Sequence, residues 1–124
     1  TAERLREGSR PAMGFGVRDG ADVVGSVRLW PVVIGETPAL FLGPIAVDAT
    51  RRSDGLGADM IEASIDYARS QGVDGVLLVG DFAYFQRFGF KHAPDAVLPG
   101  PVDRGRVLWA ATKVDRVFGP VRIA

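Results

Sequence analysis

The sequence contains no cysteine and a single histidine, His92, and both shortages exclude kinds of chemistry. Without cysteine the chain has no disulfide, no thiol nucleophile and no thiolate ligand for a metal ion. One histidine cannot hold a zinc ion by itself, because such a site needs several further ligands around the metal. We therefore predict that the protein holds no metal ion.

The chain also lacks an excess of charge of either sign and any long hydrophobic run. Its 15 basic and 15 acidic residues cancel, so no overall field attracts nucleic acid or an anionic membrane. No apolar run approaches the ~18 residues of a membrane span, and no signal-peptide pattern precedes the domain. These shortages predict a cytoplasmic protein that binds neither nucleic acid nor membrane, and any phosphate binding must be local.

A single domain over residues 1–124, of mixed α/β class, is predicted from the length and the order of the elements. The 124 residues, 47% of them hydrophobic, suffice for one core. A helix between two strongly apolar strands predicts a β-α-β crossover whose strands are parallel. This helix is expected to bury one stripe: Leu56, Met60, Ile61, Ile65 and Ala68. The predicted strands cover 13–18, 23–33, 39–47, 73–79, 107–114 and 117–123, and the predicted helices cover 56–70 and 82–88.

The segment from residue 45 to residue 57, IAVDATRRSDGLG, says most about function. An apolar strand ends there, a turn rich in glycine and arginine follows, and a helix begins. Such a turn can hold an anion, because its N–H groups are unpaired and the helix dipole adds partial positive charge. A Walker loop is excluded because no Gly-Lys-Ser/Thr follows, and a dinucleotide fingerprint lacks its third glycine. The six-residue pattern alone also matches an ordinary strand-to-helix turn.

Three motifs in the same order resemble the GNAT-type N-acetyltransferase family, in particular one bacterial branch of it. They are LGPIAV at 42–47 with the arginine–glycine turn, LLVGD at 77–81, and YFQRFGF at 84–90. The resemblance implies a mostly antiparallel twisted sheet with a central splayed pair of parallel strands. It also implies transfer of an acetyl group from acetyl-coenzyme A to a primary amine of a small molecule or peptide, by direct attack in a ternary complex.

The resemblance further implies which residues contact the cofactor. The pantetheine arm would add to the free edge of the splayed strand, as a peptide adds to a sheet. This free edge would also explain why Pro44 is tolerated there. Asp54 departs from the family, because a carboxylate beside the pyrophosphate should weaken its binding unless it pairs with Arg51 or Arg52. The implied cofactor-binding residues are Ile45, Ala46, Val47, Arg52, Ser53, Asp54, Gly55, Leu56, Gly57 and Phe85.

The catalytic residues are less clearly implied. Many members have a tyrosine five residues before the last phenylalanine of the aromatic helix, where its hydroxyl protonates the departing thiolate. Here that position is Phe85, so Tyr84 is the acid candidate by elimination, although it could equally pack in the core. Asp81 is the chosen base candidate because open sheets place ligands at the carboxyl ends of parallel strands, although it could be a helix N-cap. Other base candidates are Glu36, Asp48 and His92.

A complete domain of this family begins with a strand and two helices ahead of the segment at residue 13. Here that region is expected to be absent or truncated, so a partner such as a second copy of the chain could supply the acceptor wall. The missing wall and Phe85 also motivate an alternative function, a non-catalytic acyl-coenzyme A-binding or sensing module. A nucleotide-binding α/β protein of another class is a more remote alternative.

Overall fold

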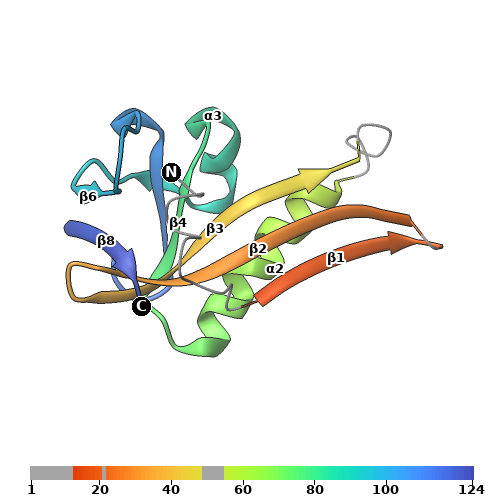
Figure 1. Ribbon diagram of the computed structural model, residues 1–124, viewed down its shortest axis with the longest axis horizontal. Helices are drawn as coiled ribbons and strands as arrows, with labels where there is room; N and C mark the ends of the chain where they lie inside the picture. Colours follow the sequence, from red (N-terminus) through yellow and green to blue (C-terminus); the bar gives the residue numbers. More distant parts are fainter. Residues whose placement is uncertain (1–12, 21, 49–54) are drawn as a thin grey trace.

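The computed structural model describes residues 13–20, 22–48 and 55–124, and eight strands of this part form one sheet (Figure 1). The strand order is β5-β7-β4-β3-β2-β8-β6, and β1 pairs with β2 beside β8. The strands are β1 (Met13–Asp19), β2 (Asp22–Ile34), β3 (Thr37–Val47), β4 (Gly75–Val79), β5 (Lys91–His92), β6 (Ala96–Val97), β7 (Val107–Ala111) and β8 (Gly119–Ile123). The helices are α2 (Leu56–Gln71) and α3 (Phe82–Phe85), with 3-10 turns η2 (Gln86–Phe88) and η3 (Arg104–Arg106).

The sheet is mostly antiparallel and contains the predicted crossover. Strands β3 and β4 are parallel and are connected through α2, while β1–β2, β2–β3, β4–β7, β5–β7 and β2–β8 are antiparallel. A second parallel pair, β6–β8, lies at the edge. The mixed α/β fold predicted from the sequence is therefore confirmed.

Strands β3 and β4 diverge after a short contact, which forms a fork in the sheet. They pair only at Leu40–Val76 and Phe41–Leu77, after which β3 continues to Val47 without β4 beside it. In Figure 1, β3 runs toward the right while β4 rises toward α3. The predicted splayed pair is thus present, and its opening lies at the carboxyl end of β3.

Pro44 is accommodated by a bulge at the start of this fork. Between two successive β2–β3 pairs, β3 has one more residue than β2, and the Gly43–Pro44 peptide bond there is cis. The bulge lies between the pairs Val27–Ile45 and Leu29–Leu42. Because a bulged residue is not part of the regular ladder, proline's missing N–H costs no interstrand hydrogen bond.

Two hydrophobic clusters cover the two faces of the sheet. On one face α2 packs through Met60, Ile61, Ile65 and Ala68 against residues of β2, β3, β4 and β7. On the other face the segments between β5 and β8 cover a cluster centred on Trp109 and the buried Trp30. The sheet therefore has a core on both sides, and the fork opens between its central strands β3 and β4, near α3.

Several predicted boundaries were wrong for identifiable reasons. Strand β7 ends at Ala111, because the N–H groups of Thr112 and Lys113 both donate to the Asp74 carbonyl and turn the chain out of the ladder. The predicted stripe of α2 includes Leu56, which is only half-buried, whereas the buried Ser64 was not expected. Ser64 is tolerated because its hydroxyl donates to the Met60 carbonyl, 2.7 Å away.

The short elements β5, β6 and η3 were not predicted either, because two- and three-residue elements carry no periodicity. Within the part of the chain that the structure describes, no helix is long and apolar enough to cross a membrane.

Candidate functional site

A groove of about 640 Å³ lies along the free part of β3, above the first turn of α2 and beside α3. Its described lining residues are Ile45, Ala46, Val47, Gly55, Gly57, Ala58, Ile61, Tyr84, Phe85 and Arg87. Residues far apart in the sequence thus meet in one place. The structure brings together seven residues that the sequence singled out: Ile45, Ala46, Val47, Gly55, Gly57, Tyr84 and Phe85.

The first turn of α2 forms the floor of this groove. Gly55 is the N-cap and has a left-handed backbone with φ 78°, which favours glycine. The Asp59 N–H donates to the Gly55 carbonyl, 3.0 Å away, so the N–H groups before Asp59 have no partner within the helix. A Cβ atom at Gly55 would meet no atom of the described residues within 4 Å, so with respect to this part of the chain the space above the turn is open.

The remaining residues of the predicted phosphate turn are placed differently. Leu56 is half-buried and does not line the groove. Arg52, Ser53 and Asp54 lie outside the described residues. The predicted contacts of these residues with the cofactor therefore stay predictions.

Tyr84 leans toward the first turn of α2. A Cβ atom built on Gly57 would lie 3.5 Å from the Tyr84 hydroxyl oxygen and 3.7 Å from Cγ2 of Val47. The end of β3, the start of α2 and the side chain from α3 therefore meet at Gly57. Tyr84 is 37% exposed, so it borders the groove and is not a core residue.

Arg87 is a groove residue that the sequence reasoning missed. Its guanidinium carbon lies 4.8 Å from the centre of the Tyr84 ring, and its Nε donates to the Tyr84 carbonyl at 3.0 Å. Among the described lining residues it is the one with a charged side chain. The signal that could have identified it is the spacing, because residues three apart on a helical turn face the same side.

Phe85 lies at the fork, with its ring in edge-to-face contact with that of Tyr84, centre to centre 5.0 Å. It lines both the groove and a smaller apolar cavity of about 160 Å³ between β3 and β4. The ring is placed there because Gly80 has no side chain: a Cβ on Gly80 would lie 2.5 Å from Cε2 of Phe85. The edge of α3 that faces the fork therefore presents a ring without a hydroxyl.

Asp81 and the other base candidates are not among the described residues that line the groove. The Asp81 carboxylate accepts a hydrogen bond from the Ala83 N–H at 3.2 Å and caps α3, as the alternative reading of this residue predicted. His92 stacks on Phe82 with ring centres 4.2 Å apart. None of the four candidates Glu36, Asp48, Asp81 and His92 is among the described residues that line the groove.

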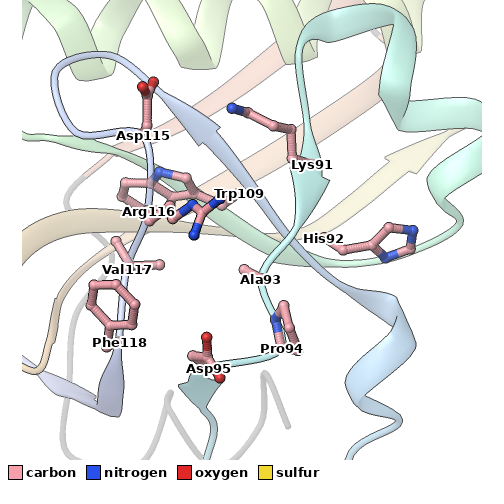
Figure 2. A pocket seen from close by; sticks show the side chains of 10 residues that line it. All are labelled: Lys91, His92, Ala93, Pro94, Asp95, Trp109, Asp115, Arg116, Val117 and Phe118. Carbon is pink, nitrogen blue, oxygen red and sulfur yellow. The ribbon is translucent and has the colours of Figure 1, made fainter.

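A second pocket lies between the segment that contains β5 and the segment that precedes β8 (Figure 2). Its volume is about 280 Å³, and Lys91, Arg116, Asp95 and Asp115 bring both signs of charge to its rim. It shares no described lining residue with the groove. The described residues contain no cluster of three or more His, Cys, Asp or Glu that could hold a metal ion.

A fork between the central strands β3 and β4, an open start of α2 and the aromatic helix α3 together define an α/β protein with a groove where its sheet divides. The chain belongs to the Acetyltransferase (GNAT) family, whose sequence model matches residues 2–90. The family membership predicted from the three motifs is confirmed.

Relatives of known sequence and structure agree with this assignment. The uncharacterized N-acetyltransferase YhbS of Escherichia coli K12 is 32% identical over 92 residues, which cover 72% of this chain and 55% of that protein. The chain therefore spans about half the length of the curated relatives it matches. The crystal structure of Escherichia coli YhbS in complex with CoA has a TM-score of 0.83 at 27% identity and covers 99% of this chain and 73% of that chain.

A second solved structure gives a similar result. A GNAT family acetyltransferase from Brucella melitensis in complex with acetyl-CoA has a TM-score of 0.76 at 26% identity. The match covers 99% of this chain and 73% of that chain.

Proposed function

We propose that the chain carries the cofactor site of an N-acetyltransferase that moves an acetyl group from acetyl-coenzyme A to a primary amine. The observation that carries this proposal is the groove, which joins the free edge of β3, the open start of α2 and the aromatic helix. The two similar structures with bound CoA and acetyl-CoA support the choice of ligand.

The groove fits the parts of this cofactor in order. The backbone of Ile45, Ala46 and Val47 would pair with the pantetheine arm along the edge that β4 leaves free. The open N–H groups at Gly57 and its neighbours would face the diphosphate. The thioester would then lie toward the apolar fork beside Phe85. When bound, the cofactor supplies the activated acetyl group.

In this arrangement positioning dominates the reaction. The fork would hold the thioester carbonyl near the backbone of β3, and an amine placed there would attack it directly. A thiolate is a tolerable leaving group, so the reaction can proceed slowly without a strong acid. The acceptor we propose is a primary amine of a small molecule or peptide.

A second candidate function is an acyl-coenzyme A-binding module without turnover. Two observations favour it. Phe85 places a ring without a proton-donating group at the fork, and the Asp81 carboxylate caps α3. Calorimetric titration with acetyl-coenzyme A tests binding, and a thiol-release assay across a panel of amines tests turnover. Binding with release supports the enzyme, binding without release supports the module, and no binding contradicts both.

Replacing Phe85 with tyrosine should raise the rate of thiol release. The new hydroxyl would lie at the fork, where it could protonate the departing thiolate; because that group already leaves readily, we expect about a tenfold gain in kcat, well below the general-acid maximum. The measurement is steady-state thiol release with the most active amine of the panel. Phe88→Tyr is the matched control, since Phe88 is absent from the groove lining, and an equal gain there would contradict the expectation.

A further inference from the structure

We propose that Arg87 and Tyr84 form a second phosphate-binding wall of the groove, which holds the diphosphate of coenzyme A from the side opposite the first turn of α2. The proposal rests on the proposed function, because it assumes that the groove holds this cofactor. It assigns Tyr84 to binding, in contrast to the acid role expected from the sequence. It also gives a role to Arg87, which belongs to the motif at 84–90 but to which the sequence analysis assigned none.

The first argument for this phosphate-binding wall is the direction of the Tyr84 side chain. Tyr84 and Phe85 are neighbours in α3, yet Phe85 lines the fork and the Tyr84 hydroxyl lies beside Gly57. In the proposed arrangement the thioester lies at the fork and the diphosphate lies at the start of α2. The two rings are in edge-to-face contact with centres 5.0 Å apart, and the Tyr84 hydroxyl on the side of Gly57 is placed to donate a hydrogen bond to a phosphate oxygen.

The second argument is that the Arg87 side chain is held in place and its terminal nitrogens are free among the described residues. Its Nε is fixed by the Tyr84 carbonyl and its plane lies over the Tyr84 ring, so the side chain is ordered before a ligand arrives. Among the described residues no acceptor is bonded to its two terminal nitrogens. These nitrogens match the paired oxygens of a phosphate group, which an arginine can bind in a bidentate manner.

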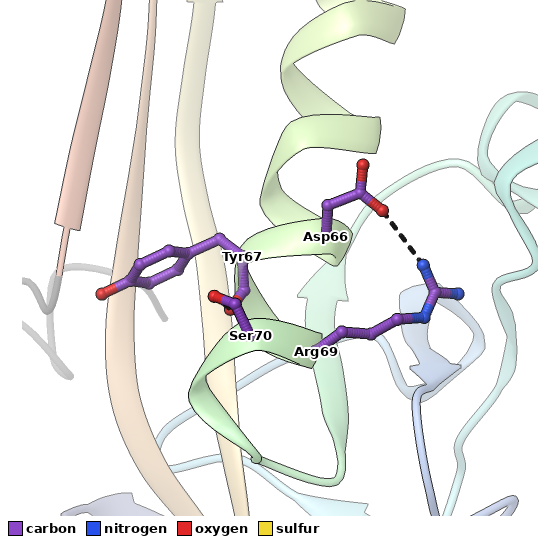
Figure 3. Close-up of polar contacts among 4 residues, drawn as sticks. All are labelled: Asp66, Tyr67, Arg69 and Ser70. Atoms are coloured by element: carbon purple, nitrogen blue, oxygen red, sulfur yellow. Dashed lines mark hydrogen bonds and ion pairs between the residues drawn. The ribbon is translucent and has the colours of Figure 1, made fainter.

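The third argument is the balance of charge among the residues that line the groove. No described lining residue is acidic, so Arg87 is not neutralised by a carboxylate within the groove. Outside the groove, Arg87 also lines another pocket with Glu62, Asp66 and Arg69 of α2; Asp66 pairs there with Arg69 at 3.1 Å (Figure 3), and among the described residues no carboxylate is paired with Arg87. Without a protein partner in the groove, the Arg87 charge is available to an anionic ligand.

Calorimetry with three ligands, coenzyme A, dephospho-coenzyme A and S-acetylpantetheine, tests the proposal in the intact chain. Arg87→Ala should weaken coenzyme A binding about tenfold, because one charge-assisted contact at an exposed site is lost. Tyr84→Phe should weaken it about threefold, because the ring that supports Arg87 is kept. Both losses should persist with dephospho-coenzyme A, which keeps the diphosphate, and should vanish with S-acetylpantetheine, which has no phosphate. Arg69→Ala is the control arginine and should change no affinity.

Each outcome decides between named alternatives. If the wild-type chain binds no coenzyme A, the proposed function fails and this proposal fails with it. If the wild type binds and Arg87→Ala binds equally well, only this proposal is overturned. A loss that disappears with dephospho-coenzyme A would assign Arg87 to the 3′-phosphate and overturn the diphosphate wall. A Tyr84→Phe variant with lower kcat and unchanged KM would overturn the binding role and favour the acid role.

Discussion

Replacing Gly55 with valine should lower the affinity for coenzyme A about 100-fold, or about 2.7 kcal/mol of binding free energy. Gly55 lines the groove at the start of α2, and none of the described residues occupies the space within 4 Å of a Cβ atom there. A branched side chain would occupy this space and keep the diphosphate from the N–H groups of the turn. Calorimetric titration of the purified variant measures the loss.

The same change also affects stability, which requires a matched control. Gly55 has φ 78°, so any side chain there costs about 1–2 kcal/mol of unfolding free energy. Gly20 in the β1–β2 turn has φ 63°, and a Cβ atom there would likewise meet none of the described residues within 4 Å, but Gly20 is not among the described residues that line the groove. Gly20→Val should therefore lose similar stability and keep its affinity. An affinity within twofold of the wild type for Gly55→Val would contradict the placement of phosphate at this turn.

Replacing Trp109 with alanine should destabilise the protein by about 3–5 kcal/mol, a large part of the free energy of unfolding of a typical domain. Trp109 is 1% exposed and fills the core on the face opposite α2. Its Nε1 donates to the Val114 carbonyl at 2.8 Å, so the variant also leaves that acceptor without its partner. Its ring packs against Gly75, where a side chain would collide with it.

Urea denaturation followed by circular dichroism measures this effect. Phe118→Ala is the control, because Phe118 is also aromatic but is 62% exposed, and we expect it to change stability by about 0.5 kcal/mol or less. Trp109 pairs with Leu77 of β4, the strand that forms one arm of the fork. A loss below about 1 kcal/mol for Trp109→Ala would show that this cluster contributes less than its burial indicates.

Much of the fold could be read from local pattern. The hairpin at Gly20, the helix over α2 and the apolar strands on either side of it all follow from periodicity and turn chemistry, which act over a few residues. The crossover followed from their order, because two strands joined by a helix pair in parallel. The predicted ends of several strands were wrong. At the end of β7, for example, the Thr112 N–H donates to the carbonyl of Asp74, which lies 38 residues earlier in the chain.

The candidate site also has a part that could be predicted from the sequence and a part that could not. The sequence by itself determined the family, the glycine turn and the free edge at Ile45 to Val47, because these depend on residue types at fixed spacing. Only the tertiary structure decided which way the aromatic side chains point: Gly80 leaves room for Phe85 at the fork, and Tyr84 is left beside Gly57 with Arg87 over its ring. Side-chain direction depends on atoms brought together from distant segments, and spacing along the chain does not encode it.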